Sequence, residues 1–457
     1  MIWQTVLAAM LPEHLLLAGI VALLVLEIAE PRSRGAVVLA LSATAAAALV
    51  ALWLWATGYS GAPFPGHYAV GPATSLAKFL LLALALPVLL LSREEFEGPR
   101  YYVLVLGSLY GACLMPASMS FLTLFLGLEL LSLPVYVLVL LGFQRPEGAE
   151  AALKYLVLGG TATATLLFGT AFLYGATGTL GIESFAAAFW SGHPMALAGA
   201  ALVIAALFLK AAVVPLHEWA PDAYEAATVP VTAYMATVVK AAVLLAALRI
   251  FGGAPVAPMI ALLPLVSMAW GNLAAIRQLS FRRMIAYSSI AHAGYLFFAF
   301  LGAAPGRYQA VMFYLATYGA MTLLAFTALP AGGDDATDDR LDALKGLFHR
   351  RPAAALAIAA AMLSLAGLPP LPGFVAKFLI FRNVLAAGHT TWAVLGLVAS
   401  YLGLYFYLRV IQLMFMQDAA EGAGKGRARR LAWLAGALCL VPAIAFAIFP
   451  GWLLDRL

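Results

Sequence analysis

The chain has 457 residues, of which 64% are hydrophobic and 10% are charged, and its mean hydropathy is +0.96. This composition leaves too little polar surface for a water-soluble protein of this length, so most of the chain is expected to lie in lipid. The net charge of +5 at pH 7 does not indicate a nucleic-acid partner, because the cytoplasmic loops of membrane proteins carry an excess of Lys and Arg. We therefore predict an all-α polytopic membrane protein.

Fourteen apolar runs are each close to the roughly 20 residues that a helix needs to cross the hydrocarbon core. They lie near residues 9–29, 36–57, 72–92, 101–117, 119–143, 150–175, 196–219, 225–250, 256–276, 284–303, 308–330, 352–381, 391–416 and 431–454. The first run has neither a basic n-region nor a small-residue cleavage site, which indicates a retained span and not a signal peptide. Residues 1–457 are predicted to form one membrane domain that ends with the helix at 431–454.

The basic residues are unevenly shared between alternate loops. If the N-terminus lies outside, sixteen of the 26 Lys and Arg residues fall in inside loops and four fall in outside segments. Because inside loops are the basic ones in membrane proteins, this alternation supports fourteen spans. It also predicts that both termini lie on the outer side.

Two of the predicted spans are interrupted by proline beside an intramembrane lysine. Pro215 follows Lys210 in the seventh span, and a proline-rich stretch precedes Lys377 in the twelfth. Proline breaks a helix, and the freed carbonyls must be satisfied by protein or water. The breaks lie five spans apart, which predicts two inverted five-helix repeats, spans 4–8 (residues 101–250) and spans 9–13 (residues 256–416), as in many ion transporters. The alternative is that the prolines only kink packed helices; the lysines beside them favour a transporter.

Four ionisable side chains lie deep in the predicted spans: Glu129, Lys210, Lys240 and Lys377. An ionisable residue inside the membrane is a functional hypothesis by default. The three lysines would form a proton relay, and Glu129 beside Lys210 would hold the proton and release it on moving away. The alternative for Glu129 is a protonated, hydrogen-bonded structural carboxyl group.

Two of the seven histidines are candidates for the same relay. His292 shares one helical face with Ser288 and Tyr295, which predicts a polar stripe suited to a water file and to a group that titrates near neutrality. His217 follows Pro215 at the broken end of the seventh span, where it would serve the inner half-channel. For both residues the alternative is an ordinary structural histidine.

Three other basic residues have simpler interpretations. Lys154 follows Glu150 by four residues, a spacing that predicts an ion pair at the inner end of the sixth span. It remains a lesser candidate for the proton path. Lys78 and Arg409 lie near span ends, where long basic side chains reach the interface, and we predict structural roles for both.

Several kinds of chemistry have no visible motif in the chain. There is no P-loop, no dinucleotide fingerprint and no cluster of metal ligands, and Cys113 and Cys439 each lie alone in an apolar run. We therefore expect no cofactor and no metal in this chain. The energy for moving protons must then come from an ion gradient or from a partner.

Three stretches of the sequence carry a resemblance to a known family. They are LKAAVVPLHEWAPDAYEAATVPVTAYMATVVKAA, RRMIAYSSIAHAGY and LAGLPPLPGFVAKF, and they resemble motifs of the antiporter-like membrane subunits of respiratory complex I, the NADH-quinone oxidoreductase. The resemblance covers roughly residues 70–416. The tyrosine of PDAYEA, Lys377 in place of a glutamate and the lack of a long lateral helix after the last span are typical of the subunit N branch. EAATVP departs from the family's usual EGAPTP.

The resemblance implies a multi-pass subunit of the bacterial inner (cell) membrane that couples electron transfer in partner subunits to proton pumping. The implied partners are M-like and K/J/A-like membrane subunits and, through them, a hydrophilic redox arm; this chain would hold no redox centre. Glu129 and Lys210 would form the pair of the first half-channel. Lys240 would connect toward the centre, and Lys377 would face the outer exit.

Two alternative functions stay open at this point. One is the large subunit of a multisubunit cation/proton antiporter or of a membrane-bound hydrogenase. The other is a non-conducting membrane scaffold, which the four intramembrane ionisable residues disfavour. Flavin and iron–sulfur subunits encoded by neighbouring genes would separate the oxidoreductase from the antiporter.

Overall fold

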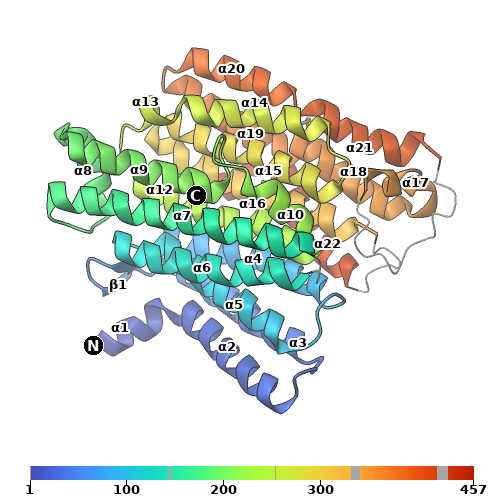
Figure 1. Cartoon of the computed structure of the whole chain (residues 1–457), viewed down its shortest axis with the longest axis horizontal. Helices are drawn as coiled ribbons and strands as arrows, with labels where there is room; N and C mark the ends of the chain where they lie inside the picture. The colour runs from blue at the N-terminus through green and yellow to red at the C-terminus, as the bar shows by residue number, and fades with distance from the viewer. Residues whose placement is uncertain (1, 143–145, 253, 331–339, 419–430, 457) are drawn as a thin grey trace. The chain divides into compact units, whose positions relative to one another are not determined.

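The computed structural model of the chain describes residues 2–142, 146–252, 254–330, 340–418 and 431–456, and these residues are mostly helical (Figure 1). They pack into two compact units. The first comprises Met1–Ala211 and Val238–Met259, and the second comprises Ala212–Thr237 and Ile260–Leu457. Residues 212–237 thus group with the second unit, although the sequence places them in the first predicted repeat. The inverted repeats and their boundaries stay a prediction.

The first unit begins with helices and a short hairpin and continues with longer helices. Its elements are α1 (Ile2–Ala9), α2 (Leu11–Ala29), α3 (Ala36–Ala56), β1 (Gly61–Phe64), β2 (Tyr68–Val70), α4 (Pro72–Ser92), α5 (Pro99–Leu114), η1 (Met115–Ala117), α6 (Phe121–Gly142), α7 (Pro146–Thr177), α8 (Glu183–Ser191), α9 (Pro194–Ala211) and α12 (Lys240–Phe251). The chain passes between the units three times: directly after α9, in the π-helical turn η2 (Met235–Val239) and in α13 (Ala257–Ile260).

The second unit holds the remaining elements. They are α10 (Trp219–Ala226), α11 (Val229–Tyr234), α14 (Leu262–Ile276), α15 (Phe281–Phe298), η3 (Ala299–Leu301), α16 (Ala304–Ala328), η4 (Leu341–Leu344), α17 (Leu347–Arg350), α18 (Pro352–Ala366), α19 (Pro372–Ala386), α20 (Thr390–Tyr401), α21 (Leu404–Met416), α22 (Ala432–Ile448) and α23 (Pro450–Leu454).

Ten helical segments of the described chain are long and apolar enough to cross a membrane. They correspond to ten of the fourteen runs expected from the sequence. The other four runs contain shorter helices: α5, α14, the pair α18 and α19, and α22. The chain is therefore a polytopic helical membrane protein, as predicted.

A two-stranded antiparallel hairpin, β1 with β2, was not expected from the sequence. The hairpin joins the start of α6 through backbone contacts. Tyr68 forms a β-bridge with Ser118, and the amide of Met119 donates to the carbonyl of His67 at 2.8 Å. The hairpin thus connects the first helices of the unit to α6.

Helices of the first unit pack mostly in chain order, with α5 on α6, α6 on α7 and α7 on α9. The contact of α7 with α9 is close because glycines meet there. A Cβ atom added at Gly169 would lie 2.8 Å from the carbonyl oxygen of Gly199. Small residues allow membrane helices to approach in this way, so α7 and α9 pack closely at this point.

In the second unit the helices α15 and α16 form the core. The segment Phe281–Leu301 is 94% buried over its most apolar window and Gly306–Ala328 is wholly buried. Helices α10 and α14 pack against α15, and α18, α19 and α22 pack against α16. Most side chains of α15 and α16, including Ser288 and His292, are therefore buried within this unit.

Both expected helix breaks are present, and backbone conformation explains where they occur. α9 ends at Ala211 because Ala212 has a φ of 60°, a left-handed conformation that is uncommon outside glycine. α18 ends at Ala366 because Gly367 has a φ of 86°, the usual helix-ending conformation. Prolines follow both ends, so neither helix can resume at once.

Candidate functional site

Lys210 and Glu129 form the ion pair that the sequence predicted. Lys210 lies in the last turn of α9 before the break, and its Nζ is 3.8 Å from Oε1 of Glu129 on α6. The side chain of Lys210 is 5% exposed and that of Glu129 is 23% exposed. The long separation leaves a loose pair that a small movement of either side chain would open.

Hydroxyl groups complete the surroundings of this pair. Nζ of Lys210 donates to Oγ of Ser132 at 3.1 Å and to the phenol oxygen of Tyr136 at 3.2 Å, and Thr163 on α7 donates to Glu129. The sequence analysis missed these partners, although Ser132 and Tyr136 follow Glu129 at helical spacings of three and seven residues. The ammonium group therefore has neutral partners that could keep it in place when the carboxylate moves.

Lys240 is the first residue of α12 and follows the π-helical turn η2 directly. It is 4% exposed. π-Helical turns are rare and often occur at functional sites. The structure thus confirms that Lys240 lies inside the protein, on a helix that packs against α9.

Lys377 lies on α19, five residues after the helix begins, and it reaches back to the end of α18. Its Nζ donates to the carbonyl oxygen of Ala366, the last residue of α18, at 2.9 Å and to Oγ of Ser400 at 3.4 Å. It also lies 4.8 Å from the centre of the Tyr295 ring. A helix C-terminus carries partial negative charge, so this position suits an ammonium group.

His292 occupies the centre of a buried hydrogen-bonded chain in the second unit. Its Nδ1 is 2.7 Å from the phenol oxygen of Tyr314, and its Nε2 is 3.0 Å from that of Tyr407. Tyr407 continues to Ser288 at 2.5 Å. The predicted face of Ser288 and His292 is therefore joined by tyrosines of α16 and α21, which the sequence analysis did not identify.

A small cavity separates His292 from Lys377. Its lining includes both residues, together with Tyr314, Tyr318 and Ser364, and its volume is about 10 Å³. That is about the space that one water molecule requires. His292, Tyr314 and Lys377 thus line one small cavity within the second unit.

His217 is held by two neighbours beside the first break. Its Nδ1 is 3.2 Å from the carbonyl oxygen of Pro215, and its Nε2 accepts from the indole of Trp270 at 3.1 Å. These two contacts hold the imidazole ring of His217 in one orientation. They do not test its predicted role in an inner half-channel.

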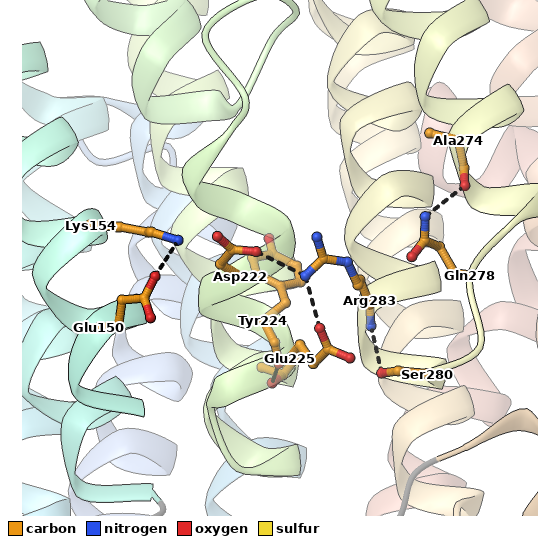
Figure 2. A network of polar contacts seen from close by, with 10 residues as sticks. Glu150, Lys154, Asp222, Tyr224, Glu225, Ala274, Gln278, Ser280 and Arg283 are labelled. Carbon is orange, nitrogen blue, oxygen red and sulfur yellow. Dashed lines mark hydrogen bonds and ion pairs between the residues drawn. The ribbon is translucent and has the colours of Figure 1, made fainter. Parts of the chain in front are cut away.

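Figure 2 shows Lys154 directed toward Glu150, in the ion pair expected from their spacing, with an N–O distance of 2.8 Å. It also shows Arg283 of α15 between two carboxylates of α10. Nη1 of Arg283 lies 2.8 Å from Asp222 and 2.8 Å from Glu225. This cluster, which the sequence analysis did not predict, ties the segment after the break to the helix that carries His292.

Lys78 corrects one expectation. It does not reach toward an interface but is 0% exposed and pairs with Glu13 at 2.7 Å. The charge of Glu13, 65 positions earlier, holds the ammonium group inside the unit. Arg409 has the expected structural role, because it donates to the carbonyl of Ile276 at the end of α14 at 2.8 Å.

The fold and the buried lysines beside helix breaks define a multi-pass membrane protein of the antiporter-like class. The family described as "NADH:quinone oxidoreductase/Mrp antiporter, TM" matches residues 118–403. NADH-quinone oxidoreductase subunit N from Pelobacter propionicus is 40% identical over 447 residues, which cover 97% of this chain and 96% of the relative. The chain therefore belongs to the NADH-quinone oxidoreductase subunit N family, as its motifs predicted.

Solved structures agree with this assignment. A chain of respiratory complex I from Thermus thermophilus with bound aureothin is 36% identical and has a TM-score of 0.85, with 97% of this chain and 98% of that chain covered. A chain of the Mrp complex from Dietzia sp. DQ12-45-1b has a TM-score of 0.86 over 98% of this chain and 96% of that chain. Its identity of 24% indicates a shared fold alone.

Proposed function

We propose that this chain is the proton-translocating, antiporter-like subunit of a bacterial NADH-quinone oxidoreductase, in which electron transfer in partner subunits drives protons across the membrane. The observation that carries the proposal is the loose pair of Lys210 and Glu129, 3.8 Å apart beside a helix break. In a poorly hydrated interior a carboxylate at this distance strongly favours the charged lysine, and its withdrawal weakens that effect. Such a pair can hold and release a proton.

The proton route we propose uses the buried groups in the order that the family resemblance implies. Glu129 and Lys210 load the proton, Lys240 passes it toward the centre, and Lys377 releases it to the outer side. His292 supplies a titratable link in the pocket of Lys377. His217 and Lys154 have auxiliary roles at the inner side.

We also propose fourteen spans, with both termini on the outer side and two inverted repeats. The support is that each of the fourteen apolar runs contains a helix in the structure, together with the inward bias of Lys and Arg. Tags at either terminus should react with impermeant reagents from the periplasm. Reaction from the cytoplasm alone would overturn this orientation.

The partners we propose are M-like and K/J/A-like membrane subunits, which connect the chain to a hydrophilic redox arm. We propose that the chain itself binds no redox cofactor and no metal. The support is the sequence, which has two isolated cysteines and no cofactor motif.

The proposal is tested with Glu129→Gln and Lys210→Ala in the whole complex, reconstituted into vesicles. Proton uptake and electron transfer are measured together, and both variants should lower the number of protons moved per electron. Lys345→Ala, at an exposed pair with Asp342, is the matched control. An unchanged ratio in both assembled variants would remove the pair from the mechanism.

The family model, whose description also names the Mrp antiporter, supports a cation/proton antiporter as the second candidate. An antiporter would exchange cations for protons without an electron donor. The same vesicles, given a sodium gradient and no donor, therefore separate the two functions. The higher identities to subunit N proteins favour the oxidoreductase.

A further inference from the structure

A second buried carboxylate–lysine pair lies in the first unit, between helices α2 and α4. Glu13 on α2 and Lys78 on α4 are each 0% exposed, with an N–O distance of 2.7 Å. The phenol of Tyr68 on β2 donates to Oε1 of Glu13 at 2.8 Å and accepts from Nζ of Lys78 at 2.7 Å. The three polar atoms therefore form a closed triangle with no net charge.

This triangle differs from the loading pair in a way that suggests a static role. Its ion pair is shorter, and both side chains are fully buried, whereas Glu129 is 23% exposed. Removal of one partner would leave an uncompensated buried charge, which is strongly unfavourable. Oε2 of Glu13 is buried and has no hydrogen-bond partner in the described chain, so the carboxylate depends on Lys78 and Tyr68.

Tyr68 connects the triangle to the helix that carries Glu129. Its strand bridges Ser118, and the neighbouring residue His67 accepts from the amide of Met119 and lies 3.1 Å from the hydroxyl of Ser120. α6 begins one residue later, at Phe121. The position of the hairpin therefore sets the position of the first turn of α6.

Apolar packing closes the same region. Tyr68 belongs to a buried cluster of side chains from α1, the residue that follows it, β2, α5 and η1: Val6, Ala9, Met10, Tyr68, Val70, Leu114 and Ala117. Such a cluster excludes water from one side of the triangle, and exclusion of water strengthens the ion pair.

We propose that Glu13, Lys78 and Tyr68 form an electrostatic latch that holds the hairpin on α2 and α4 and thereby positions α6 and Glu129. They are positioning residues and take no direct part in proton transfer. The inference rests on the proposed function, because Glu129 must carry out a step in proton transfer for its position to matter.

The test uses Glu13→Gln/Lys78→Met in the whole complex, since this double variant leaves no unpaired buried charge. Assembly, electron transfer and protons moved per electron are measured. The latch predicts an assembled complex with normal electron transfer and a lowered proton ratio. A purely structural role would reduce the amount of complex and leave the ratio of the assembled fraction unchanged.

A covalent bridge shows whether the effect passes through the hairpin. His67→Cys and Ser120→Cys, joined by a short thiol cross-linker, tie the hairpin to the start of α6. Once the two cysteines are cross-linked, the double variant should move as many protons per electron as the parent chain that carries the same cross-link. The latch proposal would be overturned if the number of protons per electron stays low after cross-linking. It would also be overturned if the double variant without the cross-link has a normal ratio.

Two further variants keep the outcomes distinct. Tyr68→Phe removes only the hydroxyl group, and it replaces the double variant in the bridging test if that variant does not assemble. Glu129→Gln is measured beside them. If Glu129→Gln keeps a normal ratio, the proposed function fails; if it lowers the ratio and the latch variants do not, only the latch fails.

Discussion

Lys210 and Lys377 both lie beside a broken helix, but their ammonium groups have different electrostatic partners. Lys210 faces the carboxylate of Glu129 at 3.8 Å. Lys377 forms no ion pair among the described residues and donates instead to the carbonyl of Ala366 at 2.9 Å. A carboxylate carries a full charge on a rotatable side chain, whereas a helix end carries a partial charge fixed in the backbone.

The difference teaches that two equivalent sequence patterns can produce two kinds of lysine site. The charge beside Lys210 can be withdrawn by a rotamer change, so this site is suited to loading and unloading a proton. The carbonyl of Ala366, by contrast, cannot move away from Lys377 without distortion of the end of α18. On the proposed route, release of a proton from Lys377 would then depend on its other surroundings, which include a small cavity that His292 also lines.

The strongest test of this comparison is Lys377→Arg. Guanidinium keeps the charge and can still cap α18, but it does not give up its proton in a protein. If Lys377 is a proton station, we expect Lys377→Arg to lose proton transfer nearly as completely as Lys377→Ala, measured as protons per electron in the assembled complex. An arginine variant that pumps normally would make Lys377 a structural cap.

A smaller effect is expected from Tyr136→Phe, which sharpens the description of the Lys210 site. The phenol of Tyr136 is uncharged, but its oxygen accepts a hydrogen bond from Nζ of Lys210 at 3.2 Å. A hydrogen bond to a charged group contributes about 1.5–3 kcal/mol. We expect slower proton transfer with the ratio partly retained. Tyr174→Phe, on the exposed face of α7, is the control and should have no effect.

Gly367→Ala tests whether the fixed geometry at the end of α18 matters. Gly367 has a φ of 86°, and a Cβ atom there would lie 2.8 Å from Cδ of Lys377. The left-handed conformation alone costs about 1–3 kcal/mol in a non-glycine residue. We expect a lower melting temperature of the complex and impaired proton transfer.

Gly388→Ala is a matched control for that change. Gly388 has a φ of 83°, but a Cβ atom there would have nothing within 4 Å. It should lower the melting temperature and leave the proton ratio unchanged. Equal ratios in the two glycine variants would show that contact with Lys377 is unimportant.

The smallest effect is expected for Lys154→Met. Its ion pair with Glu150 is largely exposed in this chain, with side chains 46% and 66% accessible, and such helical pairs contribute about 0.3–0.5 kcal/mol. We expect stability and proton transfer close to those of the parent complex. A marked loss of pumping would instead place Lys154 on the proton path.

Much of the fold and part of the site could be predicted from the sequence because both depend on local patterns. Apolar runs of sufficient length indicate spans, and a lysine beside prolines indicates a broken helix in either unit. The pair of Glu129 and Lys210 followed from the rarity of charges in spans. The hairpin was missed because GAPF and YAV are too short to show an alternating pattern.

The sequence by itself indicated that Glu129, Lys210, Lys240 and Lys377 lie in the membrane interior, since hydropathy and the position of a charge are properties of a single segment, but it did not identify the buried pair of Glu13 and Lys78. Except for the pairs of Glu129 with Lys210 and Glu150 with Lys154, only the tertiary structure showed which groups these side chains contact. Glu13 and Lys78 meet across 65 positions, and Tyr407 reaches His292 across 115. Such contacts depend on helix packing, which brings distant turns together and which no local pattern encodes. Whether a buried lysine is locked in a short ion pair or left in a loose one follows from that packing.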